Sequence, residues 1–298
     1  MKKFVQCEGS LTKTLDFQSR DGGLTPTPSL QFSVAHQKMI RDAHAQEYDP
    51  LIAEKLALAS SLQNATVREI SHAEAKEVIL KYEWLGNMGC TDFSFGLFFG
   101  EHLAGVECFG RTAGTKVAGS VCGQRYSSTV RTLCRGACVW WAHPQSASFL
   151  IGRALHLMSA KGFHIFVAYS DSDAGEIGTV YQATNWLYCG EAKSGSSMFV
   201  WVKKPTKGYF KDGKARDERN IQHFVRSRRF KGSGIVPYTI KCTRREARAQ
   251  MVRDGFLFYK TAPKKRYVTF AGDRELVKEL RAALNWEVMP YPKRARAA

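Results

Sequence analysis

The chain has 298 residues, of which 44% are hydrophobic, and its 44 Lys and Arg against 27 Asp and Glu give a formal net charge of +17. This length fits one large domain or two modest ones, and the hydrophobic content excludes a disordered chain. No run of 18 apolar residues occurs, so we expect no transmembrane helix. The first residues lack the apolar stretch of a secretory signal, which predicts a cytoplasmic protein.

The positive charge is confined to one part of the sequence. Residues 1–198 hold 18 basic and 18 acidic side chains, whereas residues 199–298 hold 26 basic and 9 acidic ones. A surface so charged repels itself unless it meets a polyanion. We therefore expect a nucleic acid partner and no membrane binding, because no amphipathic helix with a broad apolar face accompanies the charge.

Eight cysteines are present, and none of them forms a CxxC pair. In the cytoplasm we expect them to be reduced, and most of them to be small buried side chains. The sequence also lacks HxxxH and paired His and carboxylate spacings, so we expect no metal site.

Residues 1–65 show little regular pattern. A weak helical periodicity from Phe32 to Leu62 is interrupted at Pro50, which cannot continue a helix. We treat this segment as an N-terminal extension without an assigned role.

The pattern becomes clear at residues 66–70, TVREI, which predict a strand. Ser71 followed by Glu74 predicts a capping box that opens a helix to Tyr82. Two apolar runs between Phe93 and Phe109 predict an antiparallel hairpin.

Residues 111–128 are rich in Gly and Ser, which is typical of a loop, either over a site or on plain surface. Beyond them the periodicity predicts strand, helix, strand, helix and strand in turn, at 133–142, 148–160, 163–171, 178–185 and 196–202. The alternation of strands and helices predicts an α/β fold.

The passage from strand to helix at residues 142–155, AHPQSASFLIGRAL, is a candidate phosphate site. The start of a helix presents unpaired N–H groups and the positive end of the helix dipole, which together suit a diphosphate. The residues involved are Ser146, Ala147, Ser148 and Phe149. The alternative is that Ser146 and Ser148 merely cap a core helix.

A second candidate site follows the predicted strand at 163–171. Asp171 and Asp173 lie just past its end, where open α/β sheets place their sites. Tyr181 and Asn185 come on the next predicted helix, four residues apart and hence on one face. Trp186 and Tyr188 are expected in the core.

Four motifs together resemble phage Mom-like DNA modification proteins, which belong to the GNAT acyltransferase superfamily. They are YEWLGNMG at 82–89, LCRGACVWW at 133–141, AYSDSDAGEIGTVYQATNWLYCG at 168–190 and PYPKR at 290–294. The resemblance runs from about residue 66 to 294. It implies a GNAT-like mixed, mostly antiparallel central sheet flanked by helices, and a bacteriophage protein acting in the host cytoplasm.

The resemblance implies an enzyme that adds a carbamoylmethyl group to the exocyclic amine of adenine in DNA and so blocks restriction. It implies Glu83, Asp171 and Tyr181 as catalytic residues, and an acetyl-CoA or another acyl-CoA bound by residues 146–149 and Asn185. Two departures stand out: the superfamily's phosphate loop has glycines where this chain has Ala147 and Ser148, and the family has a His-Tyr pair where this chain has Glu83 and Trp84. If Glu83 is a solvated helix-end residue, Asp171 is the leading base.

Arg135 lies in an apolar predicted strand and would be costly to bury without an anionic partner. Two interpretations are open. Arg135 pairs with Asp171, or it meets a phosphate of the substrate.

The last hundred residues interleave basic and aromatic side chains, a pattern that favours nucleic acid binding. The residues predicted to contact the polymer are Arg226, Arg228, Arg229, Lys231, Arg244, Arg245, Arg248, Lys264, Lys265 and Arg266. Helices are predicted from Thr243 to Gly255 and over 273–284, the second with Leu276, Leu280 and Leu284 on one side. We therefore expect a catalytic domain at 66–202 and a basic α+β extension at 203–298 that folds onto it.

Double-stranded DNA hides the adenine amine inside the duplex, so we expect the target base to be flipped out. Two other hypotheses remain open: a GNAT N-acetyltransferase acting on a protein or RNA acceptor, and a non-catalytic nucleic-acid-binding protein on a degenerate acyltransferase scaffold. The retained Asp171, Tyr181 and Asn185 argue against the last of these.

Overall fold

The computed structural model describes residues 36–83, 85–114, 116–192, 198–202, 216–217, 256–260 and 262–293. The chain divides into two compact units. The larger contains residues 31–194 and 262–298, and the smaller contains residues 1–30 and 195–261. The larger unit holds a seven-stranded sheet, and the strands of the smaller unit form a three-stranded one.

Two short helices precede the sheet, α1 (His36–His44) and α2 (Ile52–Leu58), followed by the 3-10 turn η1 (Leu62–Asn64). Pro50 lies between the two helices, as the interrupted periodicity predicted. The first strand, β1 (Ala65–Glu69), then leads into α3 (His72–Tyr82).

The start of α3 confirms the predicted capping box. The Ser71 hydroxyl accepts a hydrogen bond from the Glu74 amide at 3.2 Å, and the Glu74 carboxylate accepts one from the Ser71 amide at 2.8 Å. Two of the backbone donors at the helix start that would otherwise be unpaired are thereby satisfied, which fixes where the helix begins. The predicted apolar face of α3 is buried, and it consists of Ala75, Val78, Ile79 and Tyr82.

The predicted hairpin is formed by β2 (Phe93–Phe99) and β3 (His102–Gly110). The segment after it is not a loop, as its Gly and Ser content had suggested. It forms α4 (Val117–Cys122) and the 3-10 turn η2 (Gln124–Thr129). Val121 and Cys122 of α4 pack into a buried cluster, so tertiary contacts override the weak local helix propensity.

Alternating strands and helices continue as predicted, through β4 (Val130–Cys138), α5 (Ser146–Ala160), β5 (Ile165–Ser170), η3 (Ser172–Ala174), α6 (Thr179–Ala183) and β6 (Leu187–Glu191). Strand β4 begins earlier than expected, and α6 ends earlier. After the smaller unit, the chain returns as β10 (Lys265–Phe270) and α9 (Arg274–Ala282).

The larger sheet has the order β1-β2-β3-β4-β5-β10-β6, and all of its neighbours are antiparallel except β4 and β5. The place beside β6 is taken by β10, which comes about 70 residues later in the chain. The strand predicted at 196–202 exists as β7 (Met198–Val202), but it does not pair in this sheet. It lies between β8 (Arg216–Asp217) and β9 (Phe256–Lys260) in the smaller unit.

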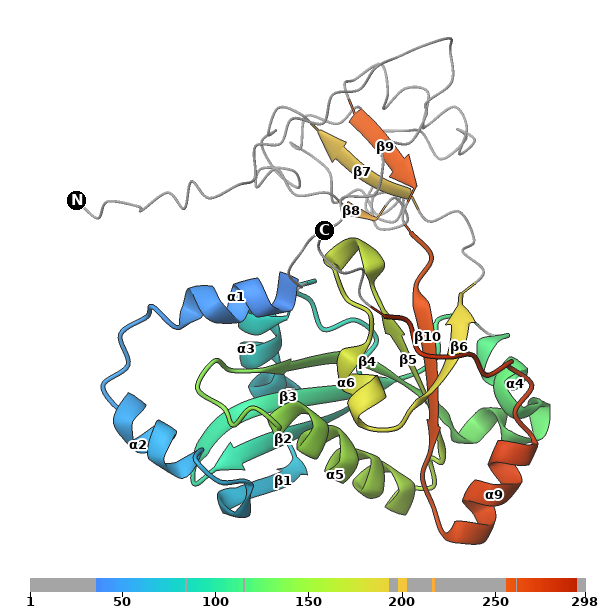
Figure 1. Ribbon diagram of the computed structural model, residues 1–298, viewed down its shortest axis with the longest axis horizontal. Helices are drawn as coiled ribbons and strands as arrows, with labels where there is room; N and C mark the ends of the chain where they lie inside the picture. The colour runs from blue at the N-terminus through green and yellow to red at the C-terminus, as the bar shows by residue number, and fades with distance from the viewer. Residues whose placement is uncertain are drawn as a thin grey trace. The chain divides into compact units, whose positions relative to one another are not determined.

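Helices cover both faces of the larger sheet. Figure 1 shows α5 and α6 in front of it and α3 behind. On the α5 side Leu150, Ile151 and Met158 are fully buried in a core that extends to Trp186 and Tyr267. Trp186 and Tyr188 are buried, as predicted. This two-sided burial holds β4 and β5, the central parallel pair, in place.

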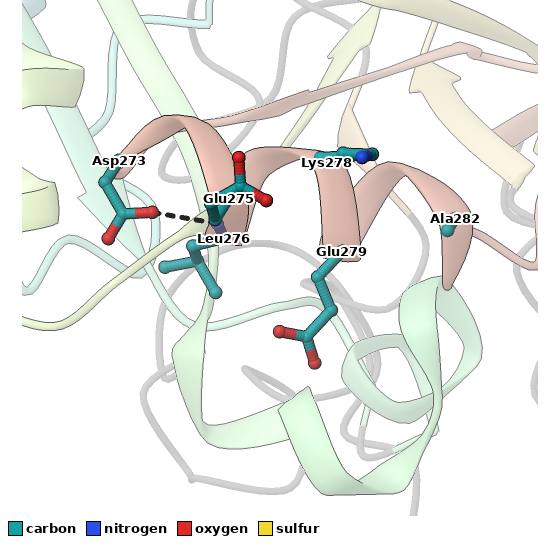
Figure 2. Close-up of a pocket in the computed structure, with 6 residues that line it drawn as sticks. All are labelled: Asp273, Glu275, Leu276, Lys278, Glu279 and Ala282. Atoms are coloured by element: carbon teal, nitrogen blue, oxygen red, sulfur yellow. Dashed lines mark hydrogen bonds between the residues drawn. The ribbon is translucent and has the colours of Figure 1, made fainter.

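Helix α9 confirms the predicted leucine face. Leu280 is buried, and Leu276 and Leu284 pack against the same cluster. Figure 2 shows the helix start, where the Asp273 side chain accepts a hydrogen bond from the Leu276 amide at 2.8 Å, and the side chains that line a hollow along the helix. Of these, Glu279 pairs with Arg125 at 3.3 Å, and none was predicted as a site residue.

Candidate active site

An opening in the sheet lies between the carboxyl ends of β4 and β5. The two strands pair only from Val130 with Ile165 to Leu133 with Ala168, whereas β4 continues to Cys138. Their carboxyl ends therefore separate. Ligands in α/β proteins bind beyond such ends, so this opening is the candidate active site.

Glu83 and Arg135 meet at the opening from the α3 side. Glu83 follows the last residue of α3, and its Oε2 accepts hydrogen bonds from the amides of Leu85 and Gly86 at 2.7 and 3.1 Å. The same oxygen lies 3.8 Å from Arg135 Nε, with exposed side-chain fractions of only 10% for Glu83 and 14% for Arg135. Burial raises the pKa of Glu83, although Arg135 and the two amides oppose the rise.

Arg135 is thus held by Glu83 and not by Asp171, which was one of the two predicted partners. Its Nε and a terminal nitrogen also donate to the backbone and side-chain oxygens of Asn87, both at 2.6 Å. The pairing follows from the alternation of side chains along β4, which points Arg135 toward α3. The side chain of Glu83 is therefore largely buried, unlike that of a solvated helix end.

Asp171 follows β5 at the other side of the opening. Its Oδ2 lies 3.2 Å from Lys264 Nζ, and its side chain is 16% exposed. The positive charge of Lys264 also acts on Glu83 and lowers its pKa. Lys264 therefore contacts Asp171 and lies within electrostatic reach of Glu83 on the other side of the opening.

Tyr181 of α6 completes the group. Its ring packs against Trp186 and Tyr267, with centroids 5.2 Å apart in both cases. Burial raises the pKa of its hydroxyl well above the ordinary value, and Glu107, Glu176 and Glu83 raise it further. The Tyr181 hydroxyl therefore keeps its proton in the free protein.

Glu107 of β3 was not singled out from the sequence. It is 4% exposed, and its Oε2 has no hydrogen-bond partner among the described residues. The sequence does hold a signal that could have identified it, because Glu107 is a single acidic residue in the apolar run LAGVECFG. A carboxyl group in such a run is either paired or functional, because its burial is unfavourable.

Helix α5 starts at the end of the short loop after β4. No side chain caps its first turn, and the Ser146 hydroxyl is buried without a hydrogen-bond partner among the described residues. Ser148 does not cap the helix either, because its hydroxyl donates to the Gln145 carbonyl at 2.9 Å. The alternative that these serines cap a core helix is therefore wrong. Phe149 is partly buried against the core, beneath Arg153.

The prediction that Asn185 and Tyr181 share one helical face is wrong. Helix α6 ends at Ala183, and Asn185 takes a left-handed backbone conformation with φ of 59°. The Trp186 amide then donates to the Tyr181 carbonyl at 2.9 Å, which closes the helix end. The exposed side chain of Asn185 therefore leaves the helix axis in a different direction from Tyr181.

Three of the predicted DNA-contacting residues lie in the larger unit and have partners there. Lys264 pairs with Asp171, and Lys265 Nζ donates to Ser172 Oγ at 2.6 Å. Arg266 donates to the Cys189 carbonyl at 2.8 Å and covers the Trp286 ring at 4.5 Å. The others lie outside the described residues: Arg226, Arg228, Arg229, Lys231, Arg244, Arg245 and Arg248.

The mixed, mostly antiparallel sheet with its separated central pair and its covering helices places the larger unit in the α/β class. Within that class, residues 64–293 match the Mom protein family, and the chain belongs to this family. Mom proteins are enzymes that modify adenine in DNA, so DNA is the substrate that the family implies. No curated protein sequence matches the chain.

Several solved structures are similar to the chain at low sequence identity. A Bacillus subtilis acetyltransferase in complex with CoA is 10% identical over 70% of this chain and 98% of its own, with a TM-score of 0.34. An N-acyl amino acid synthase from uncultured soil microbes is 13% identical over 74% and 94%, also at 0.34. A putative Salmonella typhimurium acetyltransferase with its cofactor acetyl-CoA is 13% identical over 43% and 82%, at 0.30.

Among the described residues, no helix is long and apolar enough to cross a membrane.

Proposed function

We propose that this protein adds a carbamoylmethyl group to the exocyclic amine of adenine in double-stranded DNA and thereby protects the DNA from restriction. Membership of the Mom family supports the DNA substrate and the target base. The observation that supports the site assignment is the Asp171–Lys264 ion pair at the end of β5, with Glu83 near enough to feel the charge of Lys264 and Tyr181 near enough to feel that of Glu83.

We assign the base to Asp171. As the new bond forms between the adenine N6 and carbon, N6 must lose one proton, and a carboxylate within reach is suited to take it. Glu83 is less suited, because its Oε2 is engaged by two backbone amides and by Arg135. Glu83 and Arg135 instead hold the turn after α3, and Lys264 orients Asp171.

Tyr181 is assigned the role of proton donor to the departing group. Its raised pKa keeps the hydroxyl protonated, and its ring is fixed between Trp186 and Tyr267. A proton held at a fixed position beside carboxylates is the arrangement that general acid catalysis requires.

The start of α5 is proposed to bind the diphosphate of an acyl-CoA. No side chain caps the backbone N–H groups of the first turn, and the Ser146 hydroxyl has no partner among the described residues. Both can donate hydrogen bonds to the oxygens of a diphosphate. When bound, the coenzyme would supply a thioester-linked acyl group as a carbon source; because acyl transfer to N6 gives an amide and not the N–CH2 bond of a carbamoylmethyl group, no step that forms this bond is assigned to the thioester. Ala147 and Ser148 leave the first turn accessible to it, and the exposed Asn185 is proposed to contact another part of the coenzyme.

The basic segment of the smaller unit is proposed to bind the DNA backbone and to offset the cost of flipping the adenine, a few kcal/mol. Replacing Arg244, Arg245 and Arg248 together by Gln is expected to weaken DNA binding and to flatten its dependence on salt. Binding measured by fluorescence anisotropy over a salt series tests this. An unchanged slope would contradict it.

The modification itself is tested by mass spectrometry of nucleosides from DNA of cells that express the chain. We expect deoxyadenosine to gain the mass of a carbamoylmethyl group, and both Asp171→Ala and Tyr181→Phe to abolish that product. Tyr126→Phe is the matched control, since Tyr126 lies on η2 and contacts Glu279 of α9. An acetyl group on protein or RNA, with unmodified deoxyadenosine, would support the acetyltransferase alternative.

A further inference from the structure

Glu107 lies on the face of the sheet that carries α5, directly beside Gly136 of β4. The two residues are register partners, and a Cβ added at Gly136 would come within 2.3 Å of Glu107 Oε2. A glycine at position 136 is therefore what leaves room for the carboxyl group. Gly136 lies three residues beyond Leu133, the last residue of β4 that pairs with β5, so Glu107 is next to the part of β4 that borders the opening.

The surroundings of Glu107 connect it to the candidate active site. Among the acidic groups whose charge, when they are ionised, raises the pKa of Tyr181, Glu107 is the strongest, ahead of Glu176 and Glu83. Glu107 also contributes, after burial, to a rise in the pKa of Cys138 to about 12. No cation or hydrogen bond of the described residues compensates the buried Oε2.

A carboxyl group in such surroundings holds its proton, because burial raises the pKa of Glu107 well above its ordinary value. It then presents one O–H donor and one carbonyl acceptor side by side in a plane. The complementary partner is a planar edge with an acceptor and an N–H donor side by side. An acetyl group has only the acceptor and would leave half of the carboxyl unpaired.

We propose that Glu107, seated against Gly136, is a specificity-determining residue that binds a planar amide-like edge, donor and acceptor together, inside the β4–β5 opening. Two sources present this edge: the carboxamide of the transferred carbamoylmethyl group and the N1–N6 edge of adenine. The choice between them rests on the proposed function, whereas the hydrogen-bonding character of the subsite does not.

The subsite is tested on the whole protein by ¹³C NMR of glutamate labelled at Cδ, with the Glu107 signal identified by its loss in Glu107→Gln. Acetamide, adenine and acetone are added separately at millimolar concentration. A shift with acetamide alone identifies the carboxamide, and a shift with adenine alone identifies the base. A shift with neither, or an equal shift with acetone, would overturn the proposal.

A second arm separates binding from a purely structural role. Glu107→Met removes an unpaired buried polar group, so we expect a higher Tm for the free protein together with at least a tenfold loss of modified deoxyadenosine. Gly136→Ala, which displaces the carboxyl without removing it, should also lower the product. The matched control is Thr132→Val, because Thr132 has a buried hydroxyl without a partner among the described residues and lies in the part of β4 that pairs with β5.

Thr132→Val should keep full activity. A Glu107→Met protein with a lower Tm, or with unchanged product, would overturn the proposal. A wild-type protein that leaves deoxyadenosine unmodified would instead refute the proposed function, and the NMR shifts would still decide whether the subsite binds an amide-like edge.

Discussion

The ion pair of Glu83 and Arg135 joins the end of α3 to β4 in a setting with little water. Each side chain is at most 14% exposed. Removing one partner from such a pair leaves a charge that nothing compensates, which typically costs 3–5 kcal/mol, whereas removing both costs less. The pair therefore couples the turn after α3 to the centre of the sheet.

Arg135→Met is accordingly expected to lower the free energy of unfolding by about 3–5 kcal/mol. The double variant Arg135→Met with Glu83→Met should be less destabilised than the single one. Urea denaturation of the two single variants and the double variant measures the coupling. Strictly additive effects would show that the two side chains do not interact.

Glu107 is expected to make the free energy of unfolding depend on pH, and its burial determines whether that free energy rises or falls with pH. Its pKa is raised in the folded protein, so its contribution to stability is fully present below the unfolded pKa, about 4.3, and is lost as pH rises toward the folded pKa. Tyr181 and Cys138, the titrating groups that sense it, have raised pKa values themselves and stay neutral in this range.

The free energy of unfolding of the wild type, minus that of Glu107→Gln, should therefore fall as pH rises, by up to about 1.4 kcal/mol per pH unit. Urea denaturation of both proteins between pH 5 and 8 measures this difference. Other titrating groups are common to the two proteins and cancel. A difference that is constant with pH would mean that Glu107 does not change its charge on unfolding.

At the scale of elements, the start of α5 combines two properties that a single substitution separates. An acidic side chain in the first turn stabilises a helix through its dipole, by about 0.3–1 kcal/mol, but it repels a bound diphosphate. Ala147→Asp is thus expected to raise Tm slightly and to weaken coenzyme A binding at least tenfold, as isothermal titration calorimetry can measure. Gly152→Asp adds the same charge at an exposed position farther along α5 and should leave the affinity unchanged. Equal affinities in both variants would refute the phosphate site.

The elements that follow one another along the chain could be predicted from sequence, because caps and periodicity are local. The capping box at Ser71 and the hairpin from Phe93 are examples. The position of β10 could not be predicted, since pairing between β6 and a strand about 70 residues away leaves no local signal. The end of a buried strand just before Asp171 was predicted correctly, but Glu107 was missed because its surroundings depend on Gly136 of another strand.

At the scale of the whole molecule, the charge follows the division into units. Residues 195–261 hold 17 Lys and Arg against 5 Asp and Glu, so they carry +12 of the net +17. Along the chain this segment lies between β6 and β10. These two strands are antiparallel neighbours, and at their facing ends the Ala192 amide donates to the Lys264 carbonyl at 2.7 Å. The basic segment thus leaves and re-enters the larger unit at adjacent points.

A short turn should therefore be able to replace the whole segment. Two antiparallel neighbours can be joined by a loop of about 2–5 residues, so a chain in which a Gly-Ser loop replaces residues 195–261 is expected to fold, with a net charge reduced from +17 to +5. Because most of the excess cations are gone, its affinity for DNA at low salt should fall and the salt dependence should flatten.

A chain cut after residue 261 is the contrasting variant. It keeps all the basic residues of the segment but lacks β10. It should fail to fold, since β5 and β6 lose their common partner. Thermal unfolding followed by circular dichroism, with DNA anisotropy over a salt series, distinguishes these outcomes. A folded loop variant that binds DNA as tightly as the wild type would locate the DNA contact on the larger unit instead.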